Sequence, residues 1–541
     1  MLILPSPFAS RAMATHEAPC VWTRHCQQET ADPVEGQVTG TLPPWLEGRV
    51  TRNGPGKLHV GGTPYRHLFD ALAMLHQFHI ANSRVTYRSR FLKSDSFKKN
   101  MNANRIVVTE FGTAAYPDPC MTLFKRFKNT FTVPTTKKMT DNCLVSVCQV
   151  KDEMFALTET CYTRRVDPEN LETLGDKIML TKYVAVNMAT AHPHIEEDGT
   201  VYNMGSSFSA VKGPCYNVIK MSEGSLEKAK VVASISCQWR LYPSYYHSFA
   251  MTECYWVLVE QPLVMSACKL VKGAFANQPP FDALKWLPDK KVKFRVIERA
   301  TGNLVQTLYT ADAFVIFHHV NAWESQGHLV LDLCATDDGE VVKMLCISNL
   351  EKNPGDSSRI LFRSYLRRYV LPMTGVSKAT PGENLAKLEG IACKAMKQED
   401  GSVHCTYQSL YSEFFDMPRI NYKMNGKPYR YAYGVSTKGN DLVFEMLIKV
   451  DVMTGQTWKF ESENFVVAEP IFVEAPDATD EDQGVILSTL LRKRDPRYVA
   501  LLVLSARDMS EIARAEFEAN DVVTSTFHGQ FVAAHENSHT Y

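Results

Sequence analysis

The sequence predicts an all-β fold made of many short strands. From about residue 38 onwards, short segments rich in β-branched and aromatic residues alternate with turn-forming residues, a pattern typical of a sandwich, a barrel or a propeller. A second observation is that four histidines, His192, His247, His318 and His528, each stand beside such a segment but far apart in the chain. If these histidines bind one metal ion together, their wide spacing suits a fold in which distant strands converge on one axis. No blade motif recurs at a fixed period, so the choice of architecture stays open at this point.

Length and composition restrict the class of protein. The 541 residues can bury a large core, and length alone would suggest about three or four domains, although a propeller closes its blades into one ring. Charge is balanced at 59 basic and 59 acidic residues, which argues against a nucleic-acid partner, since such a partner needs a basic stripe. The fourteen cysteines follow neither a metal motif nor a small disulfide framework. A reduced, cytosolic setting is the simplest interpretation.

The N-terminus is expected to be a flexible tail over residues 1–33, followed by a single domain over residues 34–541. Met1 to Pro5 lack basic residues and hold only a short apolar stretch, so no secretory signal is expected. Residues 1–24 contain a single acid, Glu17, and the two arginines Arg11 and Arg24. Transit peptides are poor in acids and rich in arginine, so a mitochondrial transit peptide is the alternative. No run of about eighteen apolar residues occurs, and no transmembrane helix is predicted.

The expected strands are short and are separated by turn signals. In chain order they are Arg84–Arg90, Arg105–Glu110, Met154–Thr158, Thr200–Met204, Trp256–Glu260, Val292–Glu298, Leu329–Leu333, Val443–Lys449, Gly484–Thr489 and Tyr498–Leu504.

The first of the four histidines, His192, precedes a predicted hairpin. A residue before proline favours extended backbone, so His192-Pro193 reads as a strand end. Asp198-Gly199 then supplies the positive φ that a tight turn needs. A single histidine in such a place is more often a packed polar residue than a ligand, but the three similar contexts favour a shared metal site. Imidazole binds iron, copper, nickel and zinc, so the residues alone leave the metal open.

Two stretches interrupt the β pattern. Residues 119–131 place Phe124, Phe127 and Phe131 at helical spacing with basic residues between them, and residues 263–275 are likewise apolar and basic without an acid. Interfacial membrane helices combine apolar and basic residues in this way. Two ordinary helices that cap the β-structure are the alternative.

Several motifs, in the same order, resemble the carotenoid cleavage oxygenase family, in particular its animal branch of β-carotene oxygenases and the retinoid isomerohydrolase. They are Arg52-Asn53-Gly54-Pro55-Gly56, Tyr116-Pro117-Asp118-Pro119-Cys120, the hairpin from His192 to Gly205, and the stretch from Phe317 to Glu324. The resemblance covers roughly residues 35–541. It implies a seven-bladed β-propeller with a helical cap and loops over an axial metal site.

The resemblance also implies the roles of individual residues. Non-haem iron(II), Fe²⁺, is held by His192, His247, His318 and His528, whereas His194 and His319 are not ligands. Glu159, Asp416 and Glu469 accept hydrogen bonds from His247, His318 and His528 respectively, and His192 has no such partner. Phe111, Thr158 and Tyr245 line the substrate tunnel, although as isolated residues Phe111 and Tyr245 would be assigned to the core. The stretch with Phe124, Phe127 and Phe131 contacts a membrane, as does the stretch at residues 263–275. Cys120 matches a lipidated position.

Three positions depart from the family pattern, and one of them is Cys161, which stands where asparagine is usual after Thr158-Glu159-Thr160. Asp416 stands where glutamate is usual, and the missing methylene shortens the reach by about 1.5 Å. The backbone then moves in, a water bridges, or the histidine is held more loosely. Ala71 stands where glycine is usual.

The expected function is that of an iron(II) dioxygenase, which splits a double bond of a carotenoid with dioxygen into aldehyde or ketone products. β-Carotene cut at its central bond to retinal is the leading substrate and outcome, with eccentric cleavage as an alternative. Two further candidate functions are those of a retinyl ester isomerohydrolase and of a carotenoid-binding propeller without turnover. The expected location is the cytoplasm with peripheral membrane contact, or else the mitochondrion.

Overall fold

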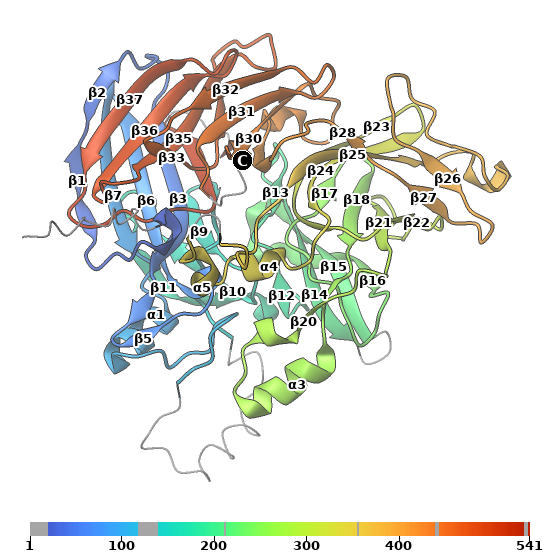
Figure 1. The fold of residues 1–541 in the computed structure, drawn as a ribbon, viewed down its shortest axis with the longest axis horizontal. Coiled ribbons are helices and arrows are strands. Elements are labelled where there is room, and N and C mark those ends of the chain that lie inside the picture. Colours follow the sequence, from blue (N-terminus) through green and yellow to red (C-terminus); the bar gives the residue numbers. More distant parts are fainter. Residues whose placement is uncertain are drawn as a thin grey trace, which may run out of the picture.

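Seven β-sheets surround a common axis in the computed structural model (Figure 1). The structure describes residues 20–116, 139–209, 213–353, 356–438, 443–534 and 539–540. Each sheet has four to six antiparallel strands, apart from one parallel pair in the fourth sheet. The expected seven-bladed β-propeller is therefore confirmed.

The first three sheets contain the following strands, in spatial order. The first has β1 (Thr30–Glu35), β7 (Arg84–Phe91), β6 (Leu72–Ala81), β3 (Gly48–Lys57), β38 (Gly529–Ala533) and β39 (His539–Thr540). The second has β11 (Thr173–Met179), β10 (Tyr162–Val166), β9 (Glu153–Leu157) and β8 (Ser146–Val150). The third has β12 (Met188–Ala189), β14 (Val201–Ser209), β15 (Gly213–Met221) and β16 (Ala229–Ser236), with β13 (His194–Ile195) paired to β14.

The other four sheets complete the ring. The fourth has β17 (Ala250–Met251), β18 (Tyr255–Glu260), β21 (Val292–Glu298), β22 (Tyr309–Ala311), β27 (Val403–Cys405) and β26 (Ala395–Lys397). The fifth has β23 (Val315–Ser325), β24 (His328–Thr336), β25 (Tyr365–Pro372) and β28 (Gln408–Ser409), and the sixth has β29 (Asp416–Arg419), β30 (Tyr431–Ser436), β31 (Met446–Asp451) and β32 (Thr457–Glu461). The seventh has β2 (Gln37–Gly40), β37 (Glu511–Glu518), β36 (Tyr498–Ser505), β35 (Gly484–Arg492) and β33 (Phe465–Val467), with β34 (Ile471–Glu474) paired to β35.

Both ends of the chain close the ring. The N-terminal strand β2 pairs with β37 of the seventh sheet, and the C-terminal strand β38 pairs with β3 of the first. In Figure 1 the blue and red strands accordingly lie side by side. Because each end of the chain joins the sheet formed by the other end, the sheets of the ring have no open seam between first and last.

Inner strands of neighbouring sheets lie next to one another around the axis. Strand β17 lies beside β23, β23 beside β29, β34 beside β38, and β38 beside β8. Loops and side chains from the ends of these strands therefore meet at the axis, although they are far apart in sequence.

Helices and two small hairpins are present in addition to the seven sheets. The described α-helices are α1 (Asp95–Ala103), α3 (Ala267–Ala276), α4 (Val341–Met344) and α5 (Ile347–Leu350). The 3₁₀ turns are η1 (Val21–Thr23), η2 (Leu68–Asp70), η4 (Leu180–Lys182), η5 (Ser222–Gly224), η6 (Leu226–Lys228), η7 (Pro280–Ala283), η8 (Val376–Lys378) and η9 (Tyr422–Met424). The two hairpins are β4 (His59–Val60) with β5 (Thr63–Pro64), and β19 (Leu263–Met265) with β20 (Leu284–Trp286).

Nine of the ten expected strands are present within a few residues of their predicted bounds, and one prediction is wrong. Residues 105–110 form a loop. Their backbone donors bond to side chains instead of a partner strand: Ile106 N–H donates to Thr63, and the N–H groups of Val107 and Val108 both donate to Asn100 Oδ1.

Residues 20–33 of the expected tail are packed on the propeller. Trp22 is buried and stacks on Phe527, with ring centroids 5.7 Å apart. Arg24 is also buried and donates to the carbonyl of Val523. Strand β1 pairs with β7. Burial of the Trp22 ring and the backbone hydrogen bonds of β1 explain why this segment packs on the propeller where a tail was predicted. Residues 1–19 lie outside the described residues.

The predicted helix at residues 263–275 begins later than expected. Leu263–Met265 forms β19, and α3 begins at Ala267, where the Ser266 side chain accepts from Lys269 N–H as an N-cap. Residues 119–131, including Cys120, Phe124, Phe127 and Phe131, lie outside the described residues. None of the described helices is long and apolar enough to cross a membrane.

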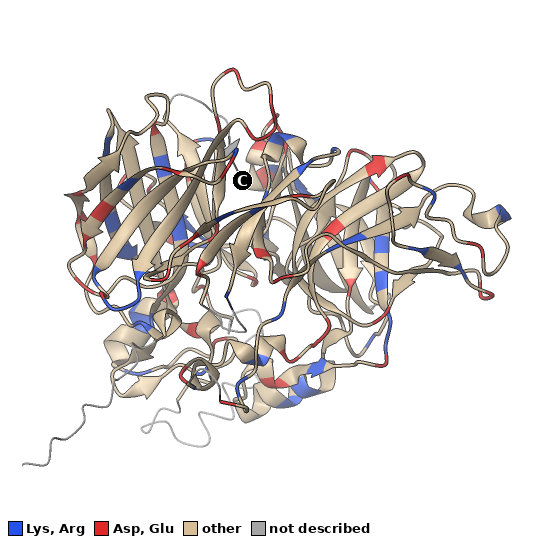
Figure 2. Ribbon diagram, turned by 45° about the horizontal axis from the view of Figure 1, so that its top comes forward, with Lys and Arg blue, Asp and Glu red and all other residues tan. Residues whose placement is uncertain are grey.

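Basic and acidic residues are interspersed over the sheets (Figure 2). This distribution agrees with the balanced composition. The thirteen described cysteines form no disulfide with one another.

Candidate metal centre

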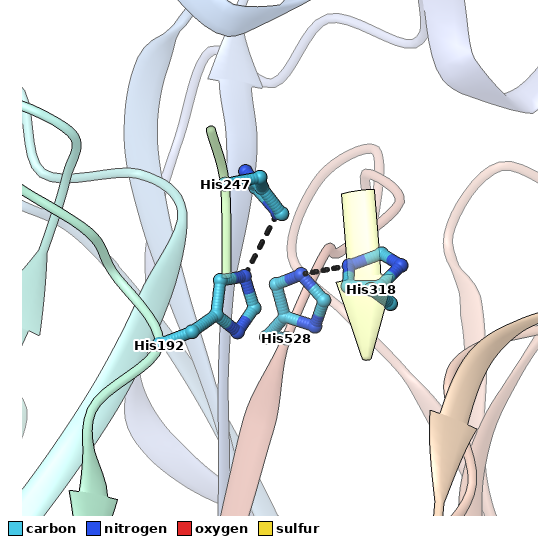
Figure 3. A group of neighbouring side chains, drawn as sticks. All are labelled: His192, His247, His318 and His528. Carbon is cyan, nitrogen blue, oxygen red and sulfur yellow. Dashed lines mark hydrogen bonds between the residues drawn. The ribbon is translucent and has the colours of Figure 1, made fainter. Parts of the chain in front are cut away.

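Four histidine side chains converge on the axis of the propeller (Figure 3). They are His192, His247, His318 and His528, and one ring nitrogen of each lies within 4.8 Å of those of the other three. Nε2 of His192 is 2.8 Å from Nε2 of His247, and Nε2 of His318 is 3.4 Å from Nε2 of His528. The structure thus brings together all four histidines that the sequence singled out.

Each histidine comes from a different sheet. His192 stands between β12 and β13, and His247 precedes β17. His318 lies within β23, whose pairing with β24 is irregular on both sides of His319. His528 immediately precedes β38. The predicted hairpin after His192 is present, with Ile195 opposite Val201 and Gly199 at φ +77°.

A carboxylate accepts a hydrogen bond from Nδ1 of three of the four rings. His247 bonds to Glu159, His318 to Asp416 at 2.6 Å, and His528 to Glu469 at 2.8 Å. His192 contacts no carboxylate among the described residues. Because Nδ1–H donates outwards, Nε2 of each of these three rings is left with a lone pair that faces the axis.

The shorter side chain Asp416 reaches its histidine directly. Asp416 lies opposite Val435 and Arg419 opposite Tyr433, so β29 carries one extra residue at this point. Met417 within this bulge has φ +51°, and its N–H donates to Asp416 Oδ1 at 2.7 Å. A bulge redirects side chains locally. Of the three outcomes considered for Asp416, the structure has the one in which the backbone brings the carboxylate into contact.

Two arginines surround Glu469, and sequence reasoning missed both. Arg419 binds both carboxylate oxygens at 3.0 Å and also donates to the carbonyl of Gly529. Arg52 is fully buried, donates to the carbonyl of Glu469, and has Nη2 3.7 Å from its carboxylate. Burial alone would raise the pKa of Glu469, but Arg419, His528 and Arg52 together lower it well below its usual range. Arg52 stands in one of the motifs read from the sequence, but nothing local in either segment identifies Glu469 as the partner.

Tyr245 has a polar role that sequence reasoning also missed. Its hydroxyl donates to Glu159 Oε2 at 2.9 Å and lies 3.4 Å from Nδ1 of His247. The side chain therefore fixes the carboxylate that holds His247, in addition to presenting an aromatic face.

His194 and His319 are engaged elsewhere. Both ring nitrogens of His194 have partners, the Tyr422 hydroxyl and the Phe249 carbonyl, each at 3.0 Å. His319 Nδ1 lies 2.8 Å from the Ser248 hydroxyl. Neither residue belongs to the cluster of four rings.

The three residues expected to line a tunnel occupy different surroundings. Phe111 packs among His67, Phe69 and Phe281 with ring centroids 5.3, 6.2 and 5.6 Å away. Tyr245 lies beside Phe317 at 6.3 Å between ring centroids. Thr158 lines an apolar cavity between the second and third sheets that neither Phe111 nor Tyr245 reaches.

The donor set fits a divalent transition metal. Burial lowers the pKa of His192 well below its usual value, and the neighbouring rings lower it further. Burial likewise lowers the pKa of His528 to about 4, although Glu469 opposes the shift. Both rings are therefore neutral near pH 7 and offer lone pairs, as metal binding requires. Neutral imidazoles with carboxylate partners are typical of iron, copper, nickel and zinc sites.

Comparison with known proteins identifies the family. The family model described as retinal pigment epithelial membrane protein matches residues 23–533, and the chain belongs to this family. The carotenoid-cleaving dioxygenase, mitochondrial, of Mustela putorius furo is 40% identical over 521 residues, which cover 93% of this chain and 95% of that protein. The β,β-carotene 15,15'-dioxygenase of Mus musculus is 39% identical over 517 residues, which cover 94% and 90%.

Among solved structures, cobalt-substituted Synechocystis apocarotenoid oxygenase matches with a TM-score of 0.74. Its sequence is 20% identical, and the match covers 95% of this chain and 98% of that chain. At this identity the likeness supports the fold alone.

Proposed function

We propose that this protein is an iron(II) dioxygenase that cleaves the central double bond of a carotenoid, with β-carotene giving retinal. The observation that carries the proposal is the set of four histidines on the propeller axis, three of them held by carboxylates. Support also comes from the two mammalian relatives, whose names describe cleavage of carotenoids.

The protein's own residues hold the metal in a fixed geometry. His192, His247, His318 and His528 would bind it through Nε2, and the three carboxylates fix the orientation of their rings. When bound, iron(II) supplies the electrons that activate dioxygen. The cleavage we propose requires no side-chain general base, so the task of the chain is to hold the metal, position the polyene and exclude water.

A line of aromatic side chains leads from the surface to the metal centre. Helix α3 packs against η7, which contains Phe281. Phe281 contacts Phe111, Phe111 contacts Phe69, and Phe69 lies edge-on to Phe527, the residue before His528. Aromatic walls suit a long polyene, and the negative faces of their rings stabilise a developing cation.

The exposed face of α3 supports contact with a membrane. Val271 and Phe275 are 60% and 55% exposed, unusually high values for apolar residues, and α3 carries Lys269 and Lys272 but no acid. Leu241, whose carbonyl accepts from Ala267 N–H, is exposed as well. Apolar residues flanked by lysines are typical of interfacial helices. A lipophilic substrate would enter the protein here from the lipid.

The proposed location is the cytoplasmic face of a membrane, with peripheral attachment through α3. The word mitochondrial in the name of one relative keeps the mitochondrion as the alternative.

The departures at Asp416 and Ala71 do not favour a protein without turnover. Asp416 contacts His318 directly, so the shorter side chain does not loosen that ring. Ala71 has φ −55° and ψ 140°, a backbone conformation that alanine adopts without strain. Neither position therefore provides a structural reason for loss of catalysis.

The test is to supply the iron-loaded protein with β-carotene and with retinyl ester, in air and under argon, and to identify the products. We expect loss of carotenoid and formation of retinal in air alone, with oxygen consumed in step with substrate. Conversion of the ester under argon with untouched carotenoid would indicate an isomerohydrolase. A shift of the carotenoid absorption band without any product would indicate a binding protein, and either result would overturn the proposal.

A further inference from the structure

An apolar cavity lies between the second and third sheets of the propeller. It offers about 80 Å³ to the centre of a water-sized molecule. Side chains of β8, β9 and β10 line it from the second sheet, and side chains of β12, β14, β15 and β16 from the third. We call it the interblade cavity. All of its lining residues lie within the described part of the chain.

The lining of the interblade cavity includes both half-buried residues and chain neighbours of the metal centre. Leu180 and Leu226 are half-buried. Thr158, Thr190 and Pro193 also line the cavity. Thr158 directly precedes Glu159, which holds His247, and Pro193 directly follows His192. Part of the wall is thus built from the chain segments that carry the metal centre.

The lining offers almost no hydrogen-bonding capacity to a ligand. Most lining side chains are aliphatic or aromatic. The polar pair of Thr190 and Asn203 is satisfied internally, because Thr190 Oγ1 donates to Asn203 Oδ1 and Asn203 Nδ2 donates to the Thr190 carbonyl at 2.9 Å. A predominantly apolar cavity holds water poorly and binds small apolar molecules such as xenon. The chemistry therefore favours an apolar gas.

We propose that the interblade cavity binds dioxygen and admits it to the metal centre on the side of His192. The inference rests on the proposed dioxygenase function. The aromatic line from α3 ends at Phe527, the chain neighbour of His528, and none of its members lines the interblade cavity. A bound polyene would fill that approach, so dioxygen arriving after the substrate needs a second route. The lining of the interblade cavity includes Thr158 and Pro193, the chain neighbours of Glu159 and His192.

The first experiment tests gas binding without any turnover. Crystals of the wild-type protein pressurised with xenon should show an anomalous peak in the interblade cavity. Ala189 and Leu226 line the cavity at β12 and η6, and the variants Ala189→Phe and Leu226→Trp fill part of it. We expect either change to abolish the xenon peak. A wild-type cavity free of xenon would overturn the inference.

The second experiment tests delivery. Leu226→Trp should raise KM for dioxygen about threefold or more and leave KM for carotenoid unchanged, because only the gas uses this route. The matched control is Leu304→Trp, at another half-buried leucine that is not among the lining residues. Loss of the xenon peak in Leu226→Trp with an unaltered dioxygen KM would overturn the delivery route.

The two experiments separate this inference from the proposed function. An enzyme that consumes no oxygen would refute the dioxygenase proposal, while xenon would still report whether the cavity takes a gas. A dioxygenase whose cavity stays empty of xenon would keep its function and lose this route.

Discussion

Each of the three carboxylates at the metal centre is held by a different partner. Glu159 accepts from the Tyr245 hydroxyl, Asp416 from its neighbour's backbone N–H, and Glu469 from two nitrogens of Arg419. A neutral donor, a peptide group and a cation differ in how strongly they draw charge from the carboxylate. The three rings therefore receive unequal support. Glu469 is the one of the three carboxylates with cationic arginine partners.

At the scale of single residues, the first prediction concerns Arg419. Replacement by glutamine removes both bonds to Glu469 and the bond to the Gly529 carbonyl, so that the carboxylate can turn away from His528. We expect Arg419→Gln to lower metal affinity or activity about ten- to a hundredfold, the usual range for residues behind a ligand. Iron content during a chelator challenge measures the effect.

The matched control is Arg430→Gln. Arg430 forms an ion pair with Asp451 of the sixth sheet, and about half of the Arg430 side chain is exposed. Arg430→Gln should retain iron like the wild type. If Arg419→Gln retained iron equally well, Arg419 would have no part in holding the metal. Arg419→Lys should recover part of the affinity, because lysine keeps the charge but not the paired bonds.

The second prediction concerns Asp416. The carboxylate is buried and already 2.6 Å from Nδ1 of His318, so a further methylene has no space to occupy. Overpacking a buried site costs about 1–3 kcal/mol. Asp416→Glu should therefore lower both the melting temperature and iron retention, despite the usual glutamate in this family. Unchanged iron binding in this variant would show that the bulge at Met417 adapts to either side chain.

At the scale of elements, α3 combines an exposed apolar face with lysines at the surface end of the aromatic line. Aspartate at Val271 and Phe275 would have to be desolvated on contact with lipid. We expect Val271→Asp and Phe275→Asp to weaken binding to lipid vesicles about tenfold or more each, since burial of one such side chain contributes about 1.5–3 kcal/mol. Vesicle co-sedimentation measures the binding.

Another exposed apolar residue provides the control for α3. Met453 is 68% exposed in the turn between β31 and β32, and Met453→Asp should leave vesicle binding unchanged. Turnover in detergent micelles should be similar in all three variants. An equal loss in Met453→Asp would mean that general surface charge, and not α3, governs attachment.

The sequence predicted most strands because alternation and turn residues are local signals. The prediction failed at the loop after α1, where the backbone N–H groups of Val107 and Val108 donate to the Asn100 side chain instead of a neighbouring strand. It also failed near Trp22, whose ring packs on Phe527 in a segment without any periodic pattern. The roles of Arg52 and Arg419 could not be predicted from spacing, because Glu469 becomes their neighbour only through the fold. Alternation in a strand does imply that His318 and His319 face opposite ways, but the register decides which one faces the axis.

At the scale of the whole molecule, the four histidines come from four different sheets of one closed ring. A metal bound by all four would join those sheets at the axis. The folded state alone assembles the site, so metal binding stabilises folding by mass action. Free iron at about a thousand times its Kd would add about 4 kcal/mol. The last prediction follows from this coupling.

We expect iron(II) to raise the melting temperature of the wild-type protein above that of the chelator-treated protein, and the increment to vanish in His318→Ala. The control is His328→Ala. His328 is a buried histidine of β24 in the same sheet, whose ring nitrogens bond to the carbonyls of Gln326 and Leu385. Its loss should lower the melting temperature with and without iron by the same amount, because the variant keeps all four ligands. A full iron-dependent increment in His318→Ala would mean that the metal is bound elsewhere.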